Sequence, residues 1–128
     1  MTTLILTGWG WQEYAVAAAV ALKALGGKAD VRGISKRHLA DFLSKEGAKW
    51  KRIYLIGVSL GGDEKLLAEA LTELRKKKVA VAWISGLQMS DSQKREIAPL
   101  LKVVLFEDGY FNGALVKAVG KAFGVEVK

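Results

Sequence analysis

Arg52-Ile53-Tyr54-Leu55-Ile56-Gly57-Val58 is an almost unbroken apolar run that begins with a cation and is followed by a glycine-rich turn. Such a run is typical of a strand that is buried on both faces of a sheet, as the inner strands of parallel sheets are. The stretch therefore predicts the central strand of an α/β fold.

Apolar strand-like segments and amphipathic helix-like segments alternate on both sides of this run. The N-cap residues Ser35 and Asp63, the Ser90–Gln93 capping box and the C-terminal pair Gly26-Gly27 mark helix ends. We expect strands at residues 3–6, 29–34, 52–58, 79–84 and 102–106, helices at 11–25, 35–45, 63–77, 90–101 and 112–123, and a short edge strand at 125–127.

Five-fold alternation predicts a three-layer α/β/α sandwich with a mostly parallel five-stranded sheet in the order 2-1-3-4-5. The chain has 128 residues and neither a linker nor an internal repeat, which predicts one domain over residues 1–128. This domain could also be the N-terminal domain of a longer protein. Right-handed crossovers place every strand-to-helix loop at one edge of the sheet, where ligands of such folds bind.

The composition excludes several classes of chemistry. The chain has no cysteine, so disulfides, thiolate nucleophiles and cysteine-bound zinc are excluded, and a cytoplasmic location is expected. The hydrophobic fraction of 51% fits a packed core. Residues 14–25 are too few and too rich in alanine for a membrane span, and the first residues lack the features of a secretory signal.

The net charge of +7 is unevenly distributed. Residues 36–52 carry six lysines and arginines against two carboxylates, which leaves open a weak contact with nucleic acid. A second basic cluster, at residues 75–78, fits the ordinary preference of cations for a helix C-terminus.

The first strand ends in the turn Thr7-Gly8-Trp9-Gly10-Trp11-Gln12-Glu13, which leads into an alanine-rich segment. This position usually carries phosphate-binding or metal-binding groups in parallel α/β folds, but the turn has no His, Asp or Lys. Its glycines give access to the backbone, and its two indoles offer stacking surfaces. The candidate ligand-binding residues at this edge are Gly8, Trp9, Gly10, Trp11, Gln12, Ser59, Gly61, Gly62, Ser85, Gly86, Asp108, Tyr110 and Asn112.

The framework of these strands and turns resembles the N-terminal domain of the DHH phosphoesterases, the family of RecJ-type nucleases. That family opens with a strand and Thr-His-x-Asp-x-Asp-Gly, of which this chain keeps Thr7. Residues 52–56 and 81–84 resemble the family's next conserved strands. Over nearly the whole chain, the resemblance implies a DHH-like fold.

Every metal ligand that the resemblance would imply is missing. Glycine or glutamine stands at the first turn's ligand positions, and Gly57 replaces the aspartate after the third strand. Ser85-Gly86-Leu87 replaces the triplet that names the family. Two-metal hydrolysis needs carboxylates and imidazoles, so we expect no catalytic residues, no metal and no cofactor. The resemblance then implies a pseudoenzyme that binds a ligand or regulates a larger assembly.

Two alternatives stay open. Gly57-Val58-Ser59-Leu60-Gly61 matches the nucleophile elbow of α/β-hydrolases, but the triad needs a histidine after the serine, and the sole histidine, His38, precedes it. A hydrolase with a rearranged metal site is the other form of this alternative. The second alternative is a self-associating module that uses the Trp turn or residues 125–127 as its contact. The partners considered are a small anionic ligand, another protein, nucleic acid and a second copy of the chain, without a membrane.

Overall fold

The computed structural model of the chain describes residues 3–8, 19, 21–58, 64–85, 90–101 and 103–106. The elements in these residues, in chain order, are β1 (Thr3–Thr7), β2 (Asp30–Gly33), α2 (Lys36–Glu46), η1 (Gly47–Lys49), β3 (Arg52–Ile56), α3 (Glu64–Lys76), β4 (Ala80–Ser85), α4 (Asp91–Glu96), η2 (Ala98–Leu100) and β5 (Val103–Phe106).

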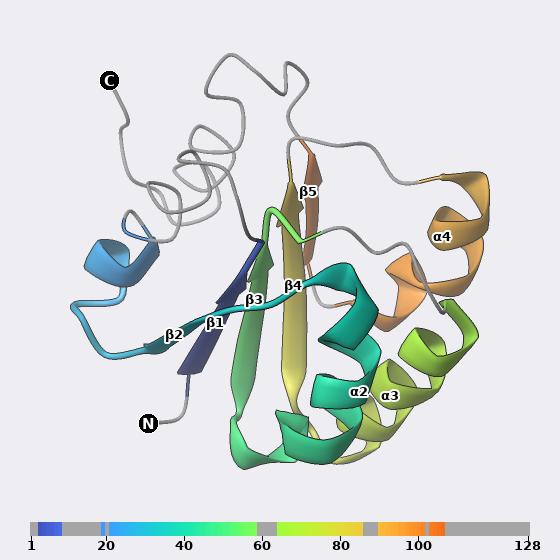
Figure 1. Cartoon of the computed structure of the whole chain (residues 1–128), viewed down its shortest axis with the longest axis horizontal. Helices are drawn as coiled ribbons and strands as arrows, with labels where there is room; N and C mark the ends of the chain where they lie inside the picture. Colours follow the sequence, from blue (N-terminus) through green and yellow to red (C-terminus); the bar gives the residue numbers. More distant parts are fainter. Residues whose placement is uncertain are drawn as a thin grey trace.

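The strands form one sheet in the order β2-β1-β3-β4-β5, and every neighbouring pair is parallel (Figure 1). In the register, Leu4 lies beside Ile53, and Ile53 lies beside Val81. The α/β class and the parallel order of the first four strands were predicted correctly from the alternation of segments. β3 has the central position that its apolar run predicts.

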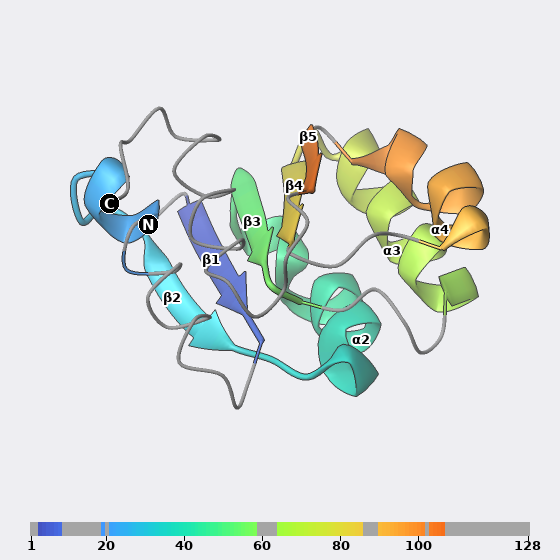
Figure 2. The ribbon, with the colours of Figure 1, turned by 90° about the horizontal axis from the view of Figure 1, so that it is seen from above.

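Both faces of the sheet are buried, because successive side chains of a strand point to opposite faces. Leu4, Ile53 and Trp83 belong to the core cluster that includes Leu43 of α2 and Leu71 of α3. The alternate residues Ile5, Ile56 and Ile84 are also buried, on the other face. The helical residues 21–24 lie on that side, across the sheet from α2 and α3 (Figure 2).

Two predicted helix ends are confirmed in atomic detail. Gly26, with φ of 67°, donates its N–H to the Lys23 carbonyl, and Gly27 donates to the Leu22 carbonyl at 2.9 Å. This is the Schellman arrangement, which satisfies the last carbonyls of a helix. At α4, the Ser90 and Gln93 side chains each accept a hydrogen bond from the other residue's backbone N–H, as the capping box predicts.

Two predicted elements are shorter in the structure. β3 ends at Ile56, before the predicted end at residue 58, because Gly57 adopts a positive φ of 69° that leaves the strand conformation. The prediction of one helix over residues 90–101 is wrong in its second half. α4 ends at Glu96, and a 3-10 turn containing Pro99 follows, because proline has no N–H to donate to the α-helical ladder.

α3 packs on the sheet through the residues that the helical spacing selects. Leu67, Ala70, Leu71 and Leu74 are buried, whereas Leu66, which shares the spacing, lies 38% exposed at the start of the helix. The buried part of this helix face therefore begins one residue later, at Leu67.

The end of α3 is strained at a lysine. Lys78 has φ of 62°, and the N–H groups of Lys78 and Val79 donate to the carbonyls of Arg75 and Leu74. This is a second Schellman arrangement, with a lysine at the left-handed position that glycine usually occupies. An L-residue pays about 1–2 kcal/mol to adopt that conformation.

We expect Lys78→Gly to raise the free energy of unfolding by about 1 kcal/mol in a urea titration, because it relieves this strain. Lys77→Gly is the matched control, since Lys77 lacks the positive φ. That control should lower stability by about 0.5–1 kcal/mol, the usual cost of glycine at a helical position. Equal losses in both variants would contradict the left-handed assignment of Lys78.

Candidate functional site

The carboxyl ends of the strands meet at one edge, as the topology predicts. The Gly8 N–H donates to the Ile56 carbonyl at 3.4 Å, and the Gly57 N–H donates to the Ile84 carbonyl at 2.9 Å. Gly8, Gly57 and Ser85 therefore follow one another across β1, β3 and β4. These are three of the positions at which the resembled family would carry metal ligands.

Most of the candidate ligand-binding residues fall outside the described part of the chain. Gly8 and the backbone of Ser85 are described, and both lie at the carboxyl edge. The N-cap role of Asp63 also stays a prediction. The remaining candidate residues stay predictions because they lie outside the described residues; they are Trp9, Gly10, Trp11, Gln12, Ser59, Gly61, Gly62, Gly86, Asp108, Tyr110 and Asn112.

A buried tryptophan fixes the chain just before the Ser59 loop. The Trp83 indole N–H of β4 donates to the Val58 carbonyl at 2.9 Å, and both residues are buried. A buried carbonyl without a donor costs free energy, so this bond holds the exit of β3 against β4. Trp83 thus positions the start of a predicted ligand loop.

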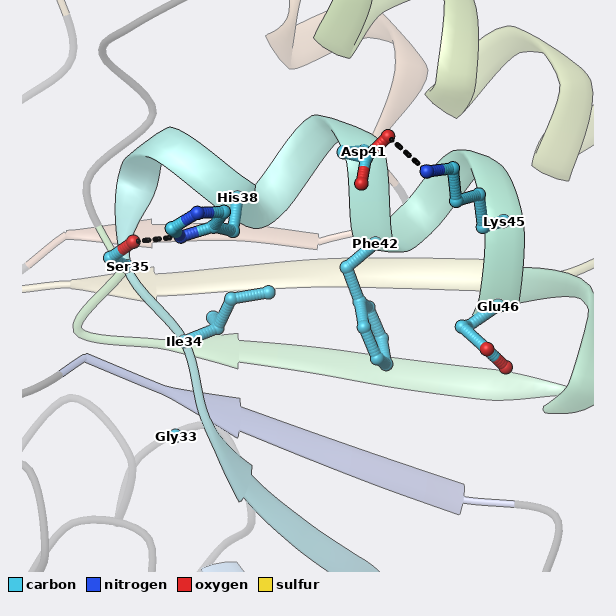
Figure 3. A pocket seen from close by; sticks show the side chains of 8 residues that line it. All are labelled: Gly33, Ile34, Ser35, His38, Asp41, Phe42, Lys45 and Glu46. Atoms are coloured by element: carbon cyan, nitrogen blue, oxygen red, sulfur yellow. Dashed lines mark hydrogen bonds and ion pairs between the residues drawn. The ribbon is translucent and has the colours of Figure 1, made fainter.

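A pocket of about 650 Å³ opens beside the carboxyl end of β2 and runs along α2 (Figure 3). Its lining residues are Gly33, Ile34, Ser35, His38, Asp41, Phe42, Lys45 and Glu46. Ile34 is buried and Phe42 half-buried, and both project between α2 and the strands in Figure 3. The volume lies within the range of small-molecule sites.

The mouth of the pocket carries a serine–histidine pair. The Ser35 hydroxyl and the His38 Nδ1 atom are 2.8 Å apart, and both side chains are exposed (Figure 3). Ser35 occupies the predicted N-cap position of α2, but its side chain makes no capping hydrogen bond, because the hydroxyl pairs with the imidazole instead. His38 is exposed on α2, one residue after Arg37.

The far end of the pocket is ionic. Lys45 pairs with Asp41 at 3.2 Å, and Lys49 forms an ion pair with Glu46. The hydrogen bond and positive charge of Lys49, with a smaller contribution from Arg32, lower the pKa of Glu46 below its ordinary value of 4.5. Glu46 is therefore a carboxylate at neutral pH.

This pocket was not predicted from the sequence. The sequence signal that could have found it is a helix face on which His38, Asp41 and Lys45 recur at helical spacing, directly after a strand that ends at the carboxyl edge. Among the described residues, no group of three or more His, Cys, Asp or Glu side chains could hold a metal ion. Within the same residues, no helix has the length and apolarity to cross a bilayer.

No family model and no curated protein matches the chain. Solved structures do share its fold. A 3-dehydroquinate dehydratase-like protein from Bifidobacterium longum has a TM-score of 0.62 at 12% identity, over 95% of this chain and 98% of that one. The sugar isomerase domain of an RpiR transcription factor from Sphaerobacter thermophilus has a TM-score of 0.55 at 18% identity, over 95% of this chain and 68% of that one.

The exonuclease RecJ, in a structure bound to manganese, has a TM-score of 0.59 at 12% identity, over 97% of this chain and 34% of RecJ. The chain thus spans about a third of the length of that enzyme. At these identities the three likenesses show a common α/β fold and nothing about activity. Because unrelated proteins match equally well, the similarity to RecJ shows the α/β class and does not distinguish a DHH-like fold.

Loss of the hydrogen bond from Trp83 to the Val58 carbonyl should lower the free energy of unfolding by a measurable amount. We expect Trp83→Phe to lower the free energy of unfolding by about 1–3 kcal/mol more than Trp50→Phe, because it leaves the Val58 carbonyl buried without a donor. Trp50 is also buried, but its indole N–H makes no hydrogen bond within the described residues, so it controls for ring size. Equal losses in denaturant titrations would contradict the role of this bond.

Proposed function

We propose that this protein is a non-catalytic, DHH phosphoesterase-like domain that binds a small organic ligand at the carboxyl edge of its sheet. The observation that carries the proposal is the pocket between β2 and α2, which combines an apolar floor with polar groups at its mouth. Its place at the strand ends agrees with the usual position of ligands in open parallel sheets.

The residues at the strand ends do not have the chemistry of a two-metal phosphoesterase site. Gly8, Gly57 and Ser85 succeed one another across three adjacent strands, and none of them is an imidazole or a carboxylate. Hydrolysis of phosphoesters by two metal ions needs such groups. Together with the sequence resemblance to the DHH family, these replacements lead us to propose a phosphoesterase-like domain that lacks its metal site.

The chemistry of the pocket favours a ligand with an aromatic body and an anionic group. Ile34 and Phe42 offer apolar surface to the body. At the mouth of the pocket, hydrogen-bond donors are available to an anion from Ser35, His38 and the first N–H groups of α2. At the far end, Lys45 is already paired with Asp41 and Glu46 is paired with Lys49, so an anion gains less there and the ligand has one favoured orientation.

Titration with benzoate and with AMP, followed by NMR, tests this pocket. We expect the amide signals of Gly33 and His38 to shift, and His38→Ala to weaken binding about tenfold, the loss of one hydrogen bond to a charged group. Arg37→Ala is the control, because Arg37 is an exposed cation on the same helix turn that does not line the pocket. Absence of shifts with both probes, or equal weakening in both variants, would overturn the proposed site.

Metal binding separates this proposal from the hydrolase alternative. We expect calorimetry with Mn²⁺ to show no site of about micromolar affinity, which would correspond to about −8 kcal/mol. A short oligonucleotide incubated with the protein and Mn²⁺ should stay intact. Two micromolar sites together with cleavage would replace the proposal by a phosphoesterase with rearranged ligands.

A further inference from the structure

The fold joins two basic clusters that are far apart in the sequence. The Ala80 N–H of β4 donates to the Lys51 carbonyl at 3.0 Å, and Arg52 lies beside Ala80 in the strand register. Lys77 and Lys78 follow the last residue of α3 and lie just before β4, which begins at Ala80. These four exposed cations, Lys51, Arg52, Lys77 and Lys78, form what we call the basic end, at the amino ends of β3 and β4 (Figure 1).

The charges of the basic end are not neutralised by neighbours. Lys49 and Lys76, which flank it, are paired with Glu46 and Glu73. Within the described residues, none of the four cations of the basic end forms an ion pair. The C-termini of α2 and α3 contribute about half a negative charge each, which is far less than the four positive charges.

The basic segment over residues 36–52 is continuous in the sequence, but in the structure its cations lie in two separate places. Lys36 and Arg37 begin α2 at the carboxyl edge, whereas Lys51 and Arg52 follow its other end. An α-helix of 11 residues is about 16 Å long, so these two pairs of cations lie at opposite ends of the molecule. The positively charged surface therefore consists of residues 51–52 and 77–78.

A cavity of about 340 Å³ adjoins this surface, between the start of β4 and η2. Arg75 and Lys78 are the ionisable residues that line it, and both are cations. The Arg75 guanidinium is held by a hydrogen bond of 3.2 Å to the Pro99 carbonyl. The cavity thus offers an anionic group a fixed arginine beside a lysine.

We propose that the basic end binds the phosphate backbone of double-stranded nucleic acid without reading its sequence. Exposed lysines and arginines that lack partners are the groups that replace counterions on such a backbone. A single strand is disfavoured because Trp50, the aromatic residue next to Lys51, is buried and offers no stacking face. A membrane is disfavoured because the exposed large apolar residues of the described chain, Val31 and Leu66, lie outside the basic end.

The test is binding of a labelled 20-base-pair duplex, followed by fluorescence anisotropy between about 50 and 200 mM salt. Four phosphate contacts predict a slope of about −3 to −4 in log K against log salt concentration. Lys51→Gln/Lys77→Gln, with one change in each cluster, should reduce this slope by about 2. A second duplex of unrelated sequence should bind equally well.

The matched control is Arg37→Gln/Lys65→Gln, which removes two exposed cations from the opposite ends of α2 and α3. It changes the net charge by the same amount and should leave the slope nearly unchanged. Equal effects of both pairs would overturn the proposal, because net charge alone would then explain binding. Stronger binding to a single strand, or binding to vesicles of anionic lipid but not to the duplex, would also overturn it.

Discussion

Parallel pairing of β3 with β1 and β4 is the constraint on which the rest of the structure depends. Because both neighbours run in the direction of β3, each connection must cross a face of the sheet, and the crossing helices bury that face. Ile53 and Leu55 point toward α2 and α3, while Ile56 is buried on the other side. The same pairing brings Gly8, Gly57 and Ser85 to one edge. The position of the carboxyl edge, where we propose that a ligand binds, therefore follows from the strand directions.

Local sequence signals predicted those features that local interactions decide. The Gly26-Gly27 helix end and the Ser90–Gln93 capping box involve residues within a few positions of one another, so the sequence alone contains their partners. Strand order was also predictable, because hydrophobic alternation and short connections leave few arrangements of a parallel sheet. The exact ends of the elements were less predictable. β3 ends at the residue before Gly57 because Gly57 has a positive φ, although the Gly57 N–H still donates to the Ile84 carbonyl of β4.

The walls of the pocket depend on tertiary contacts, and the residue type at position 78 gives no sign of a left-handed helix end. A lysine at the left-handed position of a helix end is unfavourable by itself, and here it lies where α3 must turn into β4. Ser35 has the right residue type for capping α2, yet its hydroxyl pairs with His38. The pocket arises from the spacing between β2 and α2, which depends on how Ile34 and Phe42 pack. Sequence could indicate the edge that holds the pocket, but not its walls.

The two ends of the sheet are electrostatically separate. Helices α2 and α3 run opposite to the strands, so each helix begins at the carboxyl edge and ends beside the basic end (Figure 1). At physiological ionic strength, exposed charges are screened over about 8 Å, which is roughly half the length of α2. Charges at one end therefore have little effect on an ion bound at the other. The proposed small ligand and the proposed polyanion would then bind to the same domain independently, unless one of them changes the packing of α2 or α3 against the sheet.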